Sequence, residues 1–127
     1  MSKAPRSDWY GKRQEQIEQQ AETIFAQLGG TRRLQAMAGA KKFIFGETDA
    51  RKVYVAFRVG RNAKKVNMVQ VTLDMDDTYT VEFMWISVAK SLQTTKKVKW
   101  EISGVYFDML PEIFEQGTGM YLSLIHI

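Results

Sequence analysis

Cysteine is absent from the sequence, and its 127 residues include a single histidine. Without cysteine, disulfide bonds and thiolate zinc sites are excluded. Nucleophilic catalysis by serine usually needs a neighbouring base such as histidine, and that one histidine is His126, next to the last residue. The sequence also has no glycine-rich phosphate-binding fingerprint. We therefore expect no catalytic residues, no metal site and no cofactor, and the protein is predicted not to be an enzyme.

Long apolar runs are missing as well. The longest of them span only a few residues, whereas a membrane-spanning helix needs about 20. The first eight residues are polar and no apolar segment follows them, so we expect no signal peptide. Together with the lack of cysteine, this favours a cytoplasmic protein without a membrane partner.

One group of carboxylates is a candidate for metal binding, because Asp74, Asp76 and Asp77 follow one another closely. Three carboxylates suffice to hold Mg²⁺ or Ca²⁺. The group contains no glycine of the kind that bends a calcium-binding loop. Aspartates at a hairpin tip also commonly accept hydrogen bonds from their own turn. We interpret this segment as a turn and assign no metal ligands to it.

Apolar periodicity predicts a helix over residues 8–28, preceded by a flexible arm over residues 1–7. The residues at the i, i+4, i+7 spacing of one buried stripe are Ile17, Ala21, Ile24 and Leu28. Gly29 and Gly30 are expected to end this helix, because glycine tolerates the left-handed conformation. Thr31 is expected to cap a short second helix that ends at Gly39.

Beyond residue 42 the apolar pattern changes to a period of two, which is typical of strands. The predicted strands cover residues 43–45, 53–57, 68–73, 79–86 and 98–102. A last helix is expected to be capped by Asp108, with Pro111 in its first turn, and to end at Gly117 and Gly119. The predicted class is α+β: a five-stranded, mainly antiparallel sheet with an N-terminal helix, a short second helix and a C-terminal helix packed on it. Residues 1–121 form one domain in this interpretation.

The charge is unevenly distributed along the chain, although the net charge is only +4. Residues 51–73 include six basic residues and no acidic one, and residues 87–99 include four basic residues and no acidic one. In an antiparallel meander, the loops after the second and fourth strands lie at the same end of the sheet. We therefore expect a positive rim suited to phosphates. The candidate nucleic-acid-binding residues are Arg58, Arg61, Lys64, Lys65, Lys90, Lys96, Lys97 and Lys99.

Three aromatic residues near these segments, Tyr54, Trp85 and Trp100, are candidates for stacking on bases of DNA or RNA. Two other interpretations stay open. Aromatic residues at alternating strand positions often belong to the core, and lysine-rich loops are often plain solubilising surface that blocks aggregation at sheet edges. The alternative function is a protein-binding module that inhibits or recruits a host factor. An exposed apolar patch would favour that alternative.

Several short segments resemble a family of small uncharacterised bacteriophage and mobile-element proteins. The similar segments are residues 28–30, 37–41, 71–73, 77–83, 105–114 and 118–121. The resemblance implies an accessory protein in the cytoplasm of an infected bacterial host. It implies no activity, and it assigns no functional residue.

The last six residues, 122–127, read Leu-Ser-Leu-Ile-His-Ile. This hexapeptide matches the translation of the transposase end sequence that is used to fragment DNA for sequencing. We therefore expect an artefactual tail that reflects a metagenomic origin; the alternative is a natural apolar tail that packs as a strand.

Overall fold

The computed structural model describes the backbone of residues 3–120 and the side chains of residues 11–120. The expected tail at 122–127 lies outside these residues. The elements, in chain order, are α1 (Lys3–Gln27), α2 (Thr31–Ala38), β1 (Lys41–Glu47), β2 (Val53–Arg58), β3 (Met68–Leu73), β4 (Tyr79–Val88), β5 (Thr94–Val105), a 3₁₀ turn (Phe107–Met109) and α3 (Leu110–Thr118).

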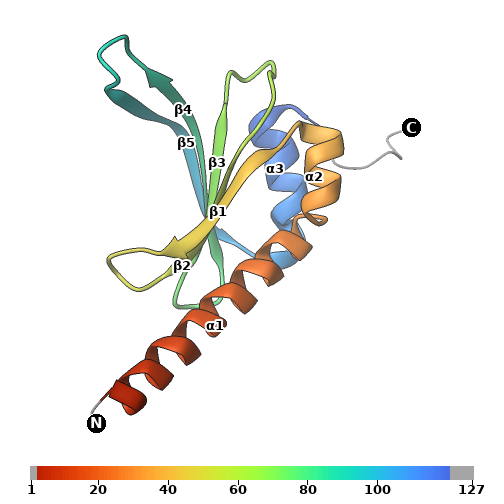
Figure 1. Ribbon diagram of the computed structural model, residues 1–127. Coiled ribbons are helices and arrows are strands. Elements are labelled where there is room, and N and C mark those ends of the chain that lie inside the picture. Colours follow the sequence, from red (N-terminus) through yellow and green to blue (C-terminus); the bar gives the residue numbers. More distant parts are fainter. Residues whose placement is uncertain (1–2, 121–127) are drawn as a thin grey trace.

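The five strands form one antiparallel meander in the order β1-β2-β3-β4-β5. The three helices lie on one side of this sheet (Figure 1). This arrangement confirms the predicted α+β class, with helices on one face of an antiparallel sheet. β1, β4 and β5 extend beyond the predicted strand boundaries, whereas β3 matches its predicted range.

α1 buries the apolar stripe that its sequence predicts. Ile17, Ala21, Ile24 and Leu28 are all buried, and the acidic and amide residues opposite them are exposed. The helix begins at Lys3, so it includes residues that the sequence analysis assigns to the N-terminal arm. Pro5 fits there, because an N–H in the first turn has no helical partner to lose.

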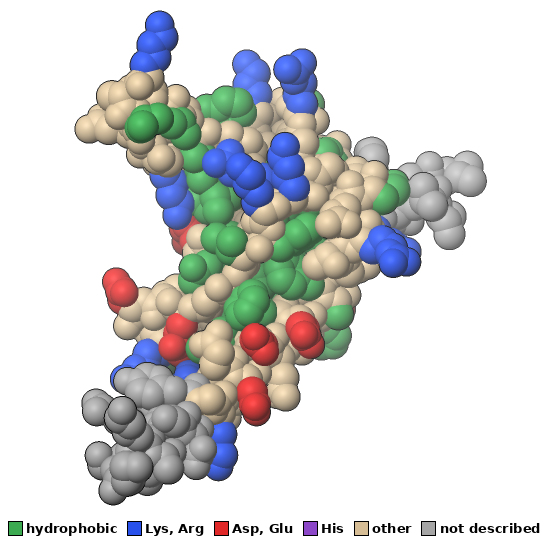
Figure 2. Space-filling view, in the orientation of Figure 1, with side chains coloured by type: hydrophobic (Ala, Val, Ile, Leu, Met, Phe, Trp, Pro, Cys, Tyr) green, Lys and Arg blue, Asp and Glu red, His purple; other side chains and the backbone are tan. Residues whose placement is uncertain are grey.

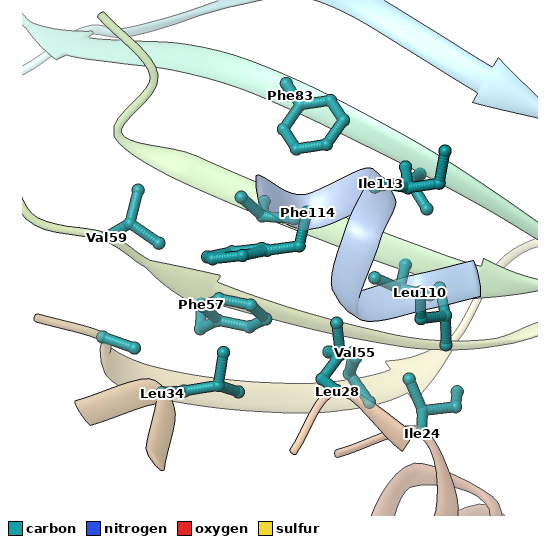
Figure 3. Packing of buried hydrophobic residues seen from close by; sticks show 14 of the residues in the cluster. Ile24, Leu28, Leu34, Val55, Phe57, Val59, Phe83, Leu110, Ile113 and Phe114 are labelled. Atoms are coloured by element: carbon teal, nitrogen blue, oxygen red, sulfur yellow. The ribbon is translucent and has the colours of Figure 1, made fainter. Parts of the chain in front are cut away.

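The core lies between the helices and alternate residues of the inner strands. Val55 and Phe57 of β2 face α3, and Phe114 of α3 points between Phe57 and Phe83 (Figure 3). The ring centroids of Phe57 and Phe114 are 6.0 Å apart. A tilted aromatic contact at this distance adds to the stabilisation from burial.

Two helix ends differ from the sequence-based expectation. The residue before α2 is Gly30, with φ +93°, and it takes the N-cap position in place of Thr31. Asp108 belongs to the 3₁₀ turn, and Met109 takes the N-cap position of α3 without a side-chain hydrogen bond. Local propensity favours Thr and Asp as caps, but at both helices the chain enters the helix through a residue without a side-chain cap. Pro111 does lie in the first turn of α3.

Gly117 does not end α3, contrary to the expectation. The helix continues to Thr118, and Gly119 ends it in the left-handed conformation. Gly117 instead lies directly against the ring of Phe83: a Cβ atom added at this position would come within 2.1 Å of Phe83 Cζ. The lack of a side chain therefore lets the backbone of α3 approach β4 closely.

We predict that Gly117→Ala destabilises the fold by about 1–3 kcal/mol, the usual cost of an extra methyl group in a packed core. Gly11→Ala is the matched control, because a Cβ atom at Gly11 of α1 would meet nothing within 4 Å. That change is expected to stabilise the protein by roughly 0.5–1 kcal/mol, because alanine favours helix. Urea denaturation measures both values. Equal effects of the two substitutions would contradict the close contact at Phe83.

Candidate nucleic-acid interface

The β2–β3 loop (59–67) and the β4–β5 turn (89–93) project from the same end of the sheet (Figure 1). We call this end the basic end. The register brings β1 there too, because Lys41 pairs with Arg58. Figure 2 shows Lys and Arg side chains gathered over this upper part of the molecule, while Asp and Glu lie over its middle and lower part together with further basic residues.

The β2–β3 loop is held in shape by the side chain of Asn62. Its Nδ2 atom donates hydrogen bonds to the carbonyl oxygens of Gly60 (2.9 Å) and Val66 (2.6 Å). Its Oδ1 atom accepts a hydrogen bond from the backbone N–H of Val66, at 3.1 Å. Asparagine suits this position because its amide both donates and accepts. One side chain therefore closes the loop from within.

Asn67 ties the same loop to β4. Its Nδ2 atom donates to the carbonyl of Ile86 and its Oδ1 atom accepts from the N–H of Ile86, both at 2.7 Å. Its backbone N–H donates to Met84 O at 2.9 Å. The amide of Asn67 thus bonds to Ile86 as a backbone peptide group of a neighbouring strand would. These bonds extend the pairing of β3 with β4. The loop cannot move far from β4 while these bonds are made.

A pocket of about 500 Å³ opens between this loop and β4. Its lining residues are Val59, Gly60, Arg61, Asn62, Lys65, Val66, Asn67 and Trp85. We call it the Trp85 pocket. Val59 and Val66 are buried and form an apolar floor, while Arg61 and Lys65 place positive charge at the rim. A pocket of this size lies within the range of about 300–1,000 Å³ that is usual for ligand sites.

Trp85 is exposed because the helices end before they reach it. Phe83 and Trp85 point to the same face of β4, since side chains alternate along a strand. Phe83 is covered by α3 at Gly117, whereas Trp85 lies one position further along this face and keeps 43% of its surface exposed. A bare indole ring beside basic side chains is typical of a surface that binds nucleic acid.

The eight candidate residues do not form one continuous surface. Arg61 and Lys65 line the pocket, and Lys97 lies opposite Trp85 in the register of β4 with β5. Lys64 passes beside Gly119 at the C-terminal end of α3, where the helix dipole favours a cation.

The other candidates lie elsewhere on the basic end. Lys96 pairs with Ile86, one residue from Lys97, and so points to the opposite face of the sheet. Arg58 pairs with Met68 on that same opposite face. Lys99 is the extra residue of a β-bulge, because its neighbours pair with Phe83 and Met84, and Lys90 lies in the β4–β5 turn. The structure thus gathers Arg61, Lys65 and Lys97 around Trp85 and distributes the rest.

Of the three candidate aromatic residues, Trp85 lines the pocket and the other two do not. Trp100 is half-buried against Phe83, with ring centroids 6.2 Å apart. Tyr54 lies against Gly46 of β1. The interpretation as core side chains therefore suits Trp100, and the interpretation as a stacking residue suits Trp85.

Sequence reasoning missed Asn62 and Asn67, which shape the pocket, and Lys41 and Lys42 at the start of β1. The two lysines were visible as a basic pair, but only the pairing of Lys41 with Arg58 places them at the basic end. Asn67 carries no local signal, because it bonds to a residue 19 positions away, whereas the bonds of Asn62 stay within its own loop.

The acidic turn at 74–78 uses its carboxylates to hold itself together. Asp76 Oδ1 accepts hydrogen bonds from the hydroxyl (2.6 Å) and the N–H (3.3 Å) of Thr78, and these bonds lower the pKa of Asp76. Asp74 accepts from the hydroxyl of Thr80 at 2.7 Å and pairs with Lys52 at 3.2 Å. This matches the interpretation as a turn. Among residues 11–120, no group of three or more potential ligand side chains is placed to hold a metal ion.

The face of the sheet away from the helices carries an acidic pair. Glu82 of β4 lies directly opposite Glu101 of β5. Burial raises the pKa of Glu82, the charge of Glu101 raises it further, and Lys96 lowers it. Lys96 therefore offsets negative charge on this face.

Comparisons with protein-family profiles, with curated proteins and with solved structures find no significant match to the chain. None of the helices within residues 3–120 is long and apolar enough to cross a membrane.

We predict that Glu82→Gln stabilises the protein at neutral pH. Because the folded state raises the pKa of Glu82 above its ordinary value of 4.5, folding favours the protonated form. Its contribution to stability is complete below the unfolded pKa and is lost as the pH rises through the folded pKa. Removing a like-charge pair across strands is worth roughly 0.2–1 kcal/mol.

Thermal unfolding at pH 7 and at about pH 4 measures this effect. The gain should be present at pH 7 and should shrink at the lower pH, where the wild-type carboxyl is increasingly protonated. Glu22→Gln on the exposed side of α1 is the control, and should change little at either pH. A gain that is equal at both values would show that charge is not its cause.

Proposed function

We propose that this protein is a non-enzymatic nucleic-acid-binding protein that contacts its partner through the basic end. The observation that carries the proposal is the Trp85 pocket, where an exposed indole ring lies among Arg61, Lys65 and Lys97. Basic side chains bind phosphates and release condensed counterions. An aromatic ring between them offers a surface on which a base can stack.

The chemistry of the pocket supports binding rather than catalysis. Among the described residues that line it there is no carboxylate, histidine or hydroxyl group, and these are the usual general acids, bases and nucleophiles. Arginine, asparagine and tryptophan bind a ligand through charge, hydrogen bonds and stacking, and Lys65 has no acidic, basic or nucleophilic partner of those kinds in the lining. The resemblance to phage and mobile-element proteins supplies a setting for this proposal, that of an accessory protein in an infected bacterial cytoplasm.

A protein-binding role is the second candidate, because apolar side chains are exposed next to α3. Tyr106 and Phe107 keep 60% and 59% of their surface exposed, and Met109 is also exposed. Adjacent exposed apolar residues are typical of protein interfaces. These residues follow β5 at the end of the sheet away from the basic end, so the two candidate functions use separate surfaces.

We predict that a triple variant, Arg61→Gln, Lys65→Gln and Lys97→Gln, weakens nucleic-acid binding and its dependence on salt. Each phosphate contact contributes about 0.7–0.9 to the slope of log affinity against log salt. The slope should therefore fall by up to roughly two to three. Fluorescence anisotropy with labelled single- and double-stranded DNA, from low salt upwards, measures both quantities.

The control is a variant with the same loss of charge at the opposite end, Lys12→Gln, Arg51→Gln and Lys52→Gln. Arg51 and Lys52 lie in the β1–β2 turn, and Lys12 lies beside Arg13, which pairs with Glu47 at the end of β1. This variant should keep most of the affinity. Equal losses in both variants would indicate diffuse attraction to a polycation. A wild-type protein that binds no nucleic acid at low salt would overturn the proposal and favour a protein partner.

A further inference from the structure

We infer that the Trp85 pocket takes an unpaired base of single-stranded nucleic acid, stacked on the indole ring, with little preference among bases. This inference rests on the proposed function and narrows its ligand. The chemistry is shared by single-stranded DNA and RNA, since both present a flat base on a phosphate chain.

The make-up of the pocket favours a single strand over a duplex. Trp85 lines the pocket together with Arg61 and Lys65 of the β2–β3 loop. In a duplex, the faces of the bases are stacked on one another, so a duplex would contact only the basic rim. An unpaired base can turn out of the strand and enter the pocket while its phosphates stay on the rim.

The two asparagine side chains that line the pocket are already bonded to backbone groups. Both N–H groups of the Asn62 amide donate within the loop, and its Oδ1 atom accepts from Val66. The amide of Asn67 bonds to Ile86 at both its oxygen and its nitrogen. These side chains shape the wall but have little capacity left to read the edge of a base.

Several backbone N–H groups of the loop are bonded as well. The N–H groups of Val59 and Gly60 donate to the carbonyls of Asn67 and Ala38, at 3.1 and 2.9 Å. The N–H of Lys65 donates to Asn62 O at 3.2 Å. Base selection requires free donors and acceptors aimed at base edges. The interactions that remain for a ligand are stacking on the indole ring and attraction to positive charge. Both tolerate any base sequence in the nucleic acid.

The position of Lys97 indicates that a nucleic-acid strand runs across the pocket. It lies opposite Trp85 on β5, whereas Arg61 and Lys65 lie on the loop between β2 and β3. The ring is therefore flanked by positive charge from two separate elements. A phosphate chain that crosses the pocket meets charge before and after the stacked base.

The experiment measures affinity by anisotropy for oligonucleotides of one length: oligo-dT, oligo-dA, oligo-U, a DNA duplex, and oligo-dT with abasic sites. We expect wild-type protein to bind oligo-dT and oligo-dA within a few-fold of each other and the duplex more weakly. Trp85→Ala should lower affinity for oligo-dT about 10- to 100-fold, the effect of one stacked base, and leave the salt slope unchanged. Trp85→Phe should retain most of the affinity.

Two comparisons separate stacking from a structural effect. Tyr106→Ala removes an aromatic ring at the other end of the sheet that is even more exposed than Trp85, and it should leave affinity unchanged. Abasic oligo-dT should bind wild-type protein about as weakly as intact oligo-dT binds Trp85→Ala, and Trp85→Ala should not distinguish the two oligonucleotides. The abasic comparison tests the inference with unmodified protein, so this test stays valid even if a variant folds poorly.

Each outcome decides a definite point. Equal affinity for duplex and single strands, or for abasic and intact oligo-dT, overturns this inference and leaves the proposed function standing. A preference above about tenfold for one base overturns the tolerance of sequence. Comparison of oligo-U with oligo-dT identifies which of the two nucleic acids supplies the strand. Failure to bind any of the oligonucleotides overturns the proposed function itself.

Discussion

The contact between the backbone of α3 at Gly117 and the ring of Phe83 sets the limits of the helical layer on this sheet. It brings α3 close to β4, and Phe114 then packs against Phe57. Because α3 ends two residues later, at Gly119, the sheet extends beyond its cover. Trp85 lies on that uncovered part. A single close approach therefore accounts for both the core and the exposed aromatic ring at the basic end.

Order in the β2–β3 loop is the second requirement for a site at this position. Loops that carry several lysines and arginines repel themselves and are often mobile. Here Asn62 closes the loop from inside and Asn67 attaches it to β4. The backbone that carries Arg61 and Lys65 is thus held beside Trp85. A ligand that binds there does not have to order the loop first, which favours affinity.

The distribution of charge around the sheet gives the molecule two unlike faces. Beyond the helices, the face that carries Trp85 also carries Lys97. The opposite face carries the Glu82–Glu101 pair, partly offset by Lys96. Consecutive lysines on β5 therefore have different surroundings. A count of basic residues along the chain cannot separate them, because alternation in a strand divides neighbours between faces.

The amino-acid sequence alone determined the class of fold, the strand order and the buried stripe of α1, because each depends on local periodicity and on short connections between neighbouring strands. It also indicated that two basic loops meet at one end. Only the tertiary structure decided that Trp85 is exposed while Trp100 is half-buried, and that Arg61, Lys65 and Lys97 flank the same ring. These outcomes depend on where α3 stops, on a bulge in β5 and on long-range bonds of Asn67. Gly119 marks the end of α3 locally, but which strand residues the helix leaves uncovered, the bulge and the bonds of Asn67 depend on contacts between distant parts of the chain, and such contacts leave no periodic pattern in the sequence.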